Sequence, residues 1–488
     1  MQHASPILKA RVIRTLSAHL DSRVELDRFN VSVFNGINVD GTGLRIFPKN
    51  QAIASAEKEP LIAIDRFSFH ADVSGLLLRP MHIGTVHVSG LDITIPPKRA
   101  GEQRNSETPK LRKADFDVDD IICEDSQLVI KSAKPDKDPH VFALKRIVLH
   151  GIGRETAASY DATLTNAVPP GEIHAIGSFG PWNTGSPGDS RLTGDYTFDH
   201  ADLNAIKGIG GTLHSVGSFE GQLNQINVHG KVDVPNFSLD TADHPLPLST
   251  RYTATVDGTS GDTFLHSIEA KLADSAFSCK GAVVNEKGKG HIIDLDVEVP
   301  GGRIQDFLSL SVKKRPAPMT AIIRTRAHLQ IHPGNERVVE KLSLGGRFEL
   351  RRIHFTDPEI EDKVDMMSLR AQGKPHEAKP GAPDVNSKMT GLFDARNGVM
   401  KITDLAYELP GATVNLEGQY SLDGKDFDFT GKVRTKAALS NMVASRWKSI
   451  LLKPVDPFFK KDGAGAEIPI RITGTGDKPH VGLKLGGR

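Results

Sequence analysis

The chain has 488 residues, in which 61 Lys and Arg nearly cancel 60 Asp and Glu. This balance gives no general field to attract nucleic acid, so we expect no nucleic-acid partner. The length exceeds one compact core, and the 46 Gly and 29 Pro favour a turn-rich β protein, either divided into domains or elongated.

The first predicted element is a helix over residues 6–20, whose one apolar side carries Ile7, Leu8, Val12, Ile13, Leu16 and Leu20. From Val24 to Ile95 the apolar period changes to two, which predicts strands. No run reaches the ~18 apolar residues that cross a bilayer, and the N-terminus lacks the apolar centre of a secretory signal.

Two polar segments without an apolar period interrupt the strand pattern, at residues 96–115 and 372–388. We therefore predict five regions. They are an N-terminal domain over 1–98, a linker over 99–115, an extended β region over 116–371, a polar loop over 372–388 and a C-terminal region over 389–488.

The stretch "VNLEGQYSLDGKDFDFTGKV", residues 414–433, is the clearest hairpin in the sequence. Apolar residues alternate with polar ones on both sides of Asp423-Gly424, a dipeptide typical of tight hairpin turns. Such strands have one dry face and one wet face, and the dry face must be covered by something.

Helices are too few to cover the predicted strands, since roughly 25 to 30 strand-like segments accompany about five helical ones. The predicted helices lie near 6–20, 201–209, 303–312, 358–371 and 436–453. Three arrangements could cover the apolar faces of the strands: stacked sandwiches, closed barrels, or a long curled sheet with an apolar groove. Recurring Gly-centred hairpins such as "GSFEGQL" and "EGQYSLDG" favour extension by repetition.

No motif indicates catalysis. The histidines form no HExxH, Cys123 and Cys279 form no CxxC, and neither a nucleophile elbow nor a P-loop occurs. Neighbouring acids such as Asp119 and Asp120 point to opposite faces of a strand. We therefore expect no enzyme, no metal and no cofactor, and two idle thiols.

Several stretches resemble the bacterial AsmA-like family, which includes TamB-type proteins. The C-terminal "WKSILLKPVDPFFKKDGAGAEIPIRITGTGDKPHVGLKL" at 447–485 is similar to that family's end, and residues 393–422 are similar to its recurring hairpin. Residues 216–239 and 256–265 also resemble the family. Residues 11–46 resemble the chorein-like start of such proteins, where a helix leads into the first curled strands.

The resemblance implies a mainly β fold, in which an elongated, curled antiparallel sheet forms a groove, with an N-terminal helix and a few short helices. It implies a non-enzymatic protein of the periplasm that binds or conducts phospholipid or another membrane lipid between the inner and outer membranes. Family members carry an inner-membrane helix ahead of this region, so an anchor upstream of Met1 is expected. Outer-membrane proteins are the other expected partners.

The shortage of helices relative to strands, together with the family resemblance, predicts which residues line such a groove. They alternate along two hairpins and are Val414, Leu416, Tyr420, Leu422, Phe427, Phe429, Val433, Phe219, Leu223, Ile226 and Val228. The alternative for these residues is an ordinary protein-filled core. The alternative function is a structural or assembly factor for envelope proteins, built from closed β modules, and a glycan-acting enzyme ranks last.

Overall fold

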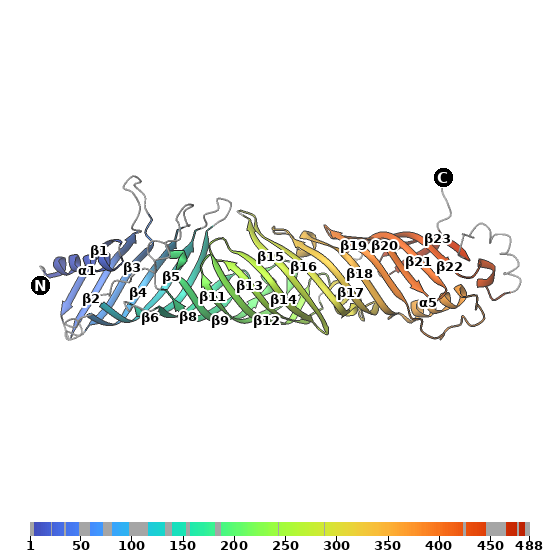
Figure 1. The fold of residues 1–488 in the computed structure, drawn as a ribbon, viewed down its shortest axis with the longest axis horizontal. Helices are drawn as coiled ribbons and strands as arrows, with labels where there is room; N and C mark the ends of the chain where they lie inside the picture. The colour runs from blue at the N-terminus through green and yellow to red at the C-terminus, as the bar shows by residue number, and fades with distance from the viewer. Residues whose placement is uncertain are drawn as a thin grey trace.

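The computed structural model describes residues 4–20, 22–33, 36–47, 59–71, 81–96, 116–131, 139–152, 157–180, 187–242, 244–286, 288–422, 426–445, 465–475 and 478–483. Their strands form one 24-stranded sheet, which curls along a long axis with the two chain ends at opposite ends of the molecule (Figure 1). The predicted fold class is confirmed: a mainly β, elongated, curled sheet with an N-terminal helix and a few short helices.

The strands follow one another across the sheet nearly in chain order. The first twelve are β1 (Arg23–Val33), β2 (Ile37–Phe47), β3 (Ile62–Ala71), β4 (Met81–Ile95), β5 (Phe116–Ile130), β6 (His140–Ile152), β7 (Ala158–Ala167), β8 (Pro170–Phe179), β9 (Arg191–Asp202), β10 (Ile209–Gly210), β11 (Thr212–Gln222) and β12 (Gln225–Leu239).

The remaining strands are β13 (Leu246–Asp257), β14 (Asp262–Leu272), β15 (Ser275–Glu286), β16 (Gly290–Arg303), β17 (Met319–Ile331), β18 (Leu342–Phe355), β19 (Lys388–Arg396), β20 (Val399–Leu409), β21 (Ala412–Ser421), β22 (Phe427–Thr435), β23 (Ala466–Thr475) and β24 (Lys478–Leu483). The predicted hairpin forms as β21 and β22, with Tyr420 opposite Phe427.

One strand pair departs from the antiparallel pattern. β4 and β5 pair in parallel, with Val88 opposite Cys123. Residues 97–115, and with them the predicted linker over 99–115, lie outside the described residues. The five-region division stays a prediction, although the sheet itself is continuous from β4 to β5.

The helices are α1 (Ala4–Leu20), α3 (Ile304–Ser311), α4 (Val338–Lys341) and α5 (Pro358–Ala371), with short 3-10 turns η1 (Pro187–Asp189), η2 (Leu203–Ala205) and η3 (Leu439–Met442). Three predicted helices are confirmed, at 6–20, 303–312 and 358–371. The prediction over 201–209 is wrong. η2 and β10 occupy that range, because Gly208 adopts a φ of +101° that a helix cannot contain.

Of the helix predicted over 436–453, residues 446–453 lie outside the described residues, and the prediction is wrong for residues 436–445, which form no α-helix. Its described part is η3, after which Val443 is extended, with φ −108° and ψ 135°. Among the described helices, none combines the length and the apolar character that crossing a membrane requires.

We call the two long edges of the curled sheet rim A and rim B. Rim A contains the β7–β8, β12–β13, β14–β15 and β20–β21 turns, and rim B contains the β11–β12, β13–β14, β15–β16 and β19–β20 turns. Helices α1, α3 and α5 all join strands at rim A, and α4 lies at rim B. These definitions locate the features described below.

Candidate functional site

The apolar face of the sheet, which we call the groove face, is continuous across the molecule. Directly paired residues point to the same side of a sheet, so a row of register partners can be followed from strand to strand. One such row runs from β1 to β23, skipping only β10. It consists of Phe29, Gly41, Phe67, Val88, Cys123, Ile147, Ala162, Ala175, Tyr196, Gly217, Gly230, Tyr252, Ile268, Cys279, Val297, Ala327, Gly346, Phe393, Ile402, Gly418, Phe429 and Ile472.

This central row contains no charged residue. Its first members, from Phe29 to Cys123, are buried, whereas most members beyond Ile147 are half-buried. A half-buried apolar row in a curled sheet is a surface that neighbouring protein covers only in part. The groove face therefore offers a long track on which an apolar ligand can lie.

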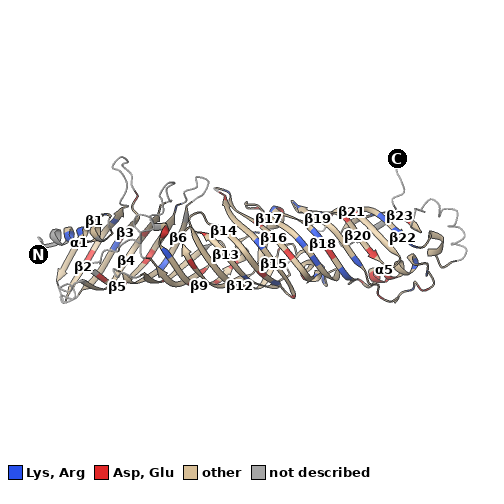
Figure 2. Cartoon of the chain, viewed as in Figure 1, with Lys and Arg blue, Asp and Glu red and all other residues tan. Residues whose placement is uncertain are grey.

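The adjacent row, one residue along each strand, faces the opposite way and contains charged residues. Figure 2 shows that Lys, Arg, Asp and Glu recur on strands along the length of the sheet. From β5 to β20 the adjacent row consists of Glu124, Arg146, Thr163, His174, Thr197, Val216, Lys231, Arg251, Glu269, Ser278, Glu298, Arg326, Arg347, Leu392 and Thr403. We call this the convex face. Between β5 and β20, charged residues therefore occur in the row on the convex face and are absent from the central row.

The predicted lining residues of β21 and β22 share the groove face. Val414 pairs with Val433, Leu416 with Gly431, Gly418 with Phe429 and Tyr420 with Phe427. Leu416, Tyr420 and Phe427 are half-buried, and the Phe427 and Phe429 rings lie 4.7 Å apart. Leu422 lies in the turn, where its amide donates to the Gly398 carbonyl at 2.8 Å.

Protein covers part of this hairpin near rim A. Val414 and Val433 are buried in a cluster that Val364 and Met367 of α5 pack against. Ser368 anchors α5 by donating to the Pro410 carbonyl at 2.7 Å. The dry side is therefore covered by protein at the rim A end and is half-buried toward rim B.

The predicted residues of β11 and β12 also share the groove face, with Phe219 opposite Val228 and Ile226 opposite Gly221. These three apolar side chains are half-buried. Leu223 differs, because it lies in the turn between the strands and is buried with Ile95 and Ile130. The structure thus places all predicted lining residues on the groove face or at its turns.

Tyrosines form the part of the groove floor that the sequence reasoning missed. The Tyr196 hydroxyl is hydrogen-bonded to those of Tyr252 and Ser215, and the Ser215 hydroxyl donates to the Lys231 carbonyl at 2.9 Å. A Cβ on Gly230 would lie 2.7 Å from the Tyr196 hydroxyl and 2.8 Å from a Tyr252 ring carbon. The rings therefore lie directly against the glycine backbone, and burial raises the pKa of Tyr252, which keeps it neutral.

Helices cover the groove face near rim A. Val12, Ile13 and Leu16 of α1 pack on the cluster that contains Val24 and Leu26. Phe307 of α3 meets Phe277 with ring centroids 6.3 Å apart, and α5 covers the region of Tyr407. These helices leave the half-buried part of the central row between them.

The rims touch at two places. Leu223 at rim B packs on Ile95 and Ile130, which end β4 and β5 at rim A. Farther along, the Arg337 guanidinium at rim B binds the Asp240 carboxylate at rim A, with N–O distances of 2.6 and 2.7 Å.

At the second place the backbones also meet. The Val338 amide donates to the Lys207 carbonyl at 3.0 Å, and a Cβ on Gly208 would lie 2.8 Å from the Val338 nitrogen. The strands from β12 to β17 connect the two sides, so the curl of the sheet brings its own rims into contact there. The groove is closed at these contacts.

Both cysteines lie in the central row and are free thiols. Burial raises the pKa of Cys123 to about 12 and that of Cys279 to about 11, so both are protonated and unreactive at neutral pH. Their positions agree with the idle thiols that the sequence predicts.

Two groups of described residues bring potential metal-ligand atoms within 4.8 Å of one another: His82, Asp117 and Asp119, and Glu361, Asp365 and Asp384. In the second group the carboxylates already accept backbone hydrogen bonds, Glu361 from Phe355 at 2.8 Å and Asp365 from Val385 at 3.0 Å. These bonds give the acids a structural role in joining α5 to the loop before β19.

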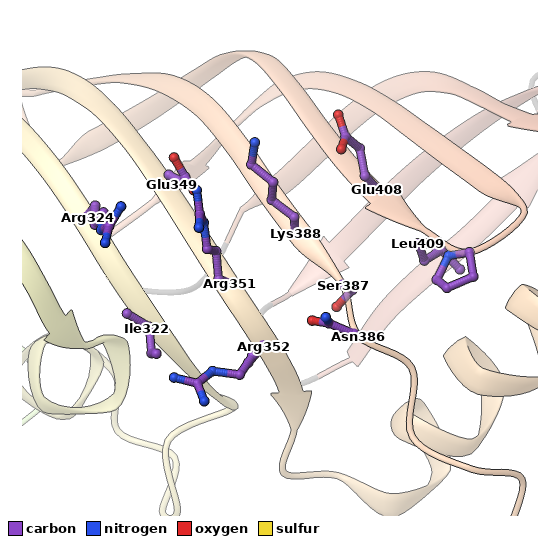
Figure 3. Close-up of a pocket in the computed structure, with 11 residues that line it drawn as sticks. Ile322, Arg324, Glu349, Arg351, Arg352, Asn386, Ser387, Lys388, Glu408 and Leu409 are labelled. Atoms are coloured by element: carbon purple, nitrogen blue, oxygen red, sulfur yellow. The ribbon is translucent and has the colours of Figure 1, made fainter.

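A cavity with a volume of ≈ 730 Å³ lies on the convex face at rim A (Figure 3). Arg324, Arg351, Arg352 and Lys388 line it together with Glu349 and Glu408. No sequence motif indicated this pocket, because its residues come from four strands that pairing brings together.

Comparisons of this chain with protein-family models, curated proteins and solved structures find no match. The resemblance described above therefore stays a prediction, and the functional argument depends on the chain's own geometry.

Proposed function

We propose that this protein binds phospholipid, or another membrane lipid, along its groove face and conducts it between two membranes. The observation that carries the proposal is the central row, which crosses the sheet from β1 to β23 without a charged residue. A lipid can lie with its acyl chains on this row and its headgroup in water, because the charged residues of the adjacent row face the other way.

The free energy of moving acyl chains between a bilayer and an apolar groove is compatible with a lipid carrier. Burying a methylene group is worth ~0.8 kcal/mol, whether the group leaves water for a bilayer or for an apolar groove. A groove that matches a membrane in apolar character therefore exchanges acyl chains with it at little net cost. Net direction must come from outside the groove.

The AsmA-like resemblance supports a location. We infer that the chain acts in the periplasm of a diderm envelope, attached to the inner membrane through an upstream anchor, and that it is not an enzyme. A structural or assembly role with outer-membrane proteins is the second candidate. That reading expected closed β modules, whereas the described strands form one sheet.

Adjacent residues of β19 provide the test. Phe393 lies in the central row, whereas Leu392 is 45% exposed on the convex face. We expect Phe393→Asp to reduce the phospholipid that co-purifies with the full chain, measured by native mass spectrometry. Leu392→Asp, which adds the same charge to the same strand, should retain wild-type lipid.

Thermal unfolding of both variants shows whether the fold survives. If Phe393→Asp unfolds, Ala327→Asp replaces it, since Ala327 lies in the same row on β17. Wild-type protein that carries no lipid and takes none from vesicles would contradict the proposal.

A further inference from the structure

The convex pocket lies where the sheet is notched at rim A. β19 begins at Lys388, whereas its neighbours β18 and β20 extend farther toward the rim, to Phe355 and Leu409. Ile322, Leu409 and Pro410 are the apolar residues of the pocket lining. Figure 3 shows Ile322 and Leu409 at opposite ends of this pocket, with Arg352, Asn386 and Ser387 between them.

Cations outnumber acids in the pocket. Arg351 pairs with Glu349, and this hydrogen bond is the main reason why the pKa of Glu349 is lowered, so that the acid stays ionised at neutral pH. Arg324, Arg352 and Lys388 form no ion pair with another described residue. Glu408 is the only other acid in the lining, so the pocket retains a net positive charge.

Backbone geometry fixes the position of Arg352. This residue has a φ of +54°, and its amide donates to the Ser387 carbonyl at 3.1 Å. A bulge of this kind turns a side chain away from the ordinary alternation of the strand. As a result the Arg352 side chain extends toward Ile322, while Arg351 lies toward Glu349 (Figure 3).

We propose that this pocket binds a phosphoryl group. Arg324, Arg352 and Lys388 lie on three neighbouring segments around one depression, and guanidinium groups match phosphate oxygens with two parallel hydrogen bonds. The phosphoryl group belongs either to a lipid headgroup, whose glycerol would meet Ile322 beside Arg352, or to a soluble phosphate. This site lies on the opposite face from the central row and does not depend on lipid conduction.

Two probes distinguish the sources: inorganic phosphate, and a soluble short-chain phosphatidic acid. Calorimetric titration of the full chain measures both. We expect Arg324→Gln combined with Arg352→Gln to weaken binding at least ~10-fold, because charge-assisted hydrogen bonds to the phosphoryl oxygens are lost. Comparable affinity for both probes indicates a free phosphate site, and a clear preference for the short-chain lipid indicates a headgroup site.

A matched control separates a built site from general electrostatics. Lys231→Gln combined with Arg251→Gln removes the same charge from exposed residues of the convex face, far along the sheet at β12 and β13. This control should bind as wild type does. Conversely, Glu408→Gln removes an acid from the pocket and should tighten binding about threefold, in line with one partly screened charge.

The proposal is overturned if the wild-type chain binds neither probe at millimolar concentration. It is equally overturned if the pocket variant and the control lose the same affinity. The substituted residues Arg324, Arg352, Glu408, Lys231 and Arg251 form no ion pair with another described residue. Circular dichroism should therefore show an unchanged fold in every variant.

Discussion

At the scale of single residues, the sequence analysis did not predict the role of glycines within strands. A period-two pattern identified Phe219, Ile226 and Val228, because each is apolar and alternates with polar neighbours. Glycine reads as a turn residue in such a pattern, yet Gly230 lies in mid-strand beneath two tyrosine rings. Its role follows from cross-strand register, which no local pattern contains.

The sequence pattern also could not predict which residues other than glycine have a positive φ. Asp125, His200, Arg352 and Asp404 all have φ between 51° and 54°, and the pairing register shifts beside several of them. Bulges of this kind re-aim side chains. The sequence could predict the strands around Arg352 but not the pocket to which the bulge directs it.

Asp365 supplies a test of the electrostatics at this scale. It is 2% exposed, and burial raises its pKa above the ordinary carboxyl value, with a further contribution from Glu361 and Asp384. Between the unfolded and native pKa values the unfolded chain binds fewer protons, so the stability of the protein falls as pH rises through that window.

We therefore expect Asp365→Asn to be more stable than wild type at neutral pH and to match it below the window. An amide oxygen can still accept the Val385 hydrogen bond. Denaturant unfolding across mildly acidic to neutral pH measures this, with Glu359→Gln, an exposed acid of the same helix, as a control. A loss of stability at neutral pH would contradict the interpretation and would suggest that the acids hold a cation.

At the scale of elements, local signals predicted most helices and hairpins but not their long-range order. α1 and α5 carry clear apolar stripes, and Pro358 begins α5 with Asp357 as its cap. The polar segment between β4 and β5 gives no information on whether they pair in parallel, so the junction could not be predicted.

Rim contact is the other element-scale feature that sequence could not reveal, since Asp240 and Arg337 are 97 residues apart. Gly208 tests it. We expect Gly208→Ala to disrupt the contact, because a Cβ there collides with the Val338 backbone and a φ of +101° is strained for alanine. The Val338 amide should then exchange with solvent at least ~5-fold faster, as a local opening cost reduced by about 1 kcal/mol requires.

Gly288→Ala serves as the control for backbone strain alone. Gly288 also has a positive φ, +69°, but a Cβ there meets nothing within 4 Å. Hydrogen exchange measured by mass spectrometry should show the effect at Val338 in the first variant only. Equal protection of Val338 in both variants would mean that the rims are held together by other contacts.

At the scale of the whole molecule, the central row distinguishes a conduit from a local binding site. In a conduit every segment is traversed, so one charge anywhere on the row should block transfer. We expect Ile147→Glu and Ile402→Glu, near opposite ends of the sheet, each to abolish lipid transfer between donor and acceptor vesicles. The double variant should transfer lipid no more slowly than either single variant.

Val216→Glu on the convex face is the matched control and should transfer lipid normally. If only one of the two groove variants is impaired, lipid binds at one place and does not travel the length of the sheet. The same vesicle measurement reports both results.

The antiparallel hairpin has a consequence for how long such a molecule can be. Neighbouring strands are ~4.8 Å apart, so one added or deleted hairpin changes the length by at most ~10 Å. Because two strands restore the chain direction, such a change leaves the apolar face, the charged face and both rims in place. The number of hairpins can therefore set the length of the protein. Evolution or a designer could match that length to the distance between two membranes in steps of one hairpin.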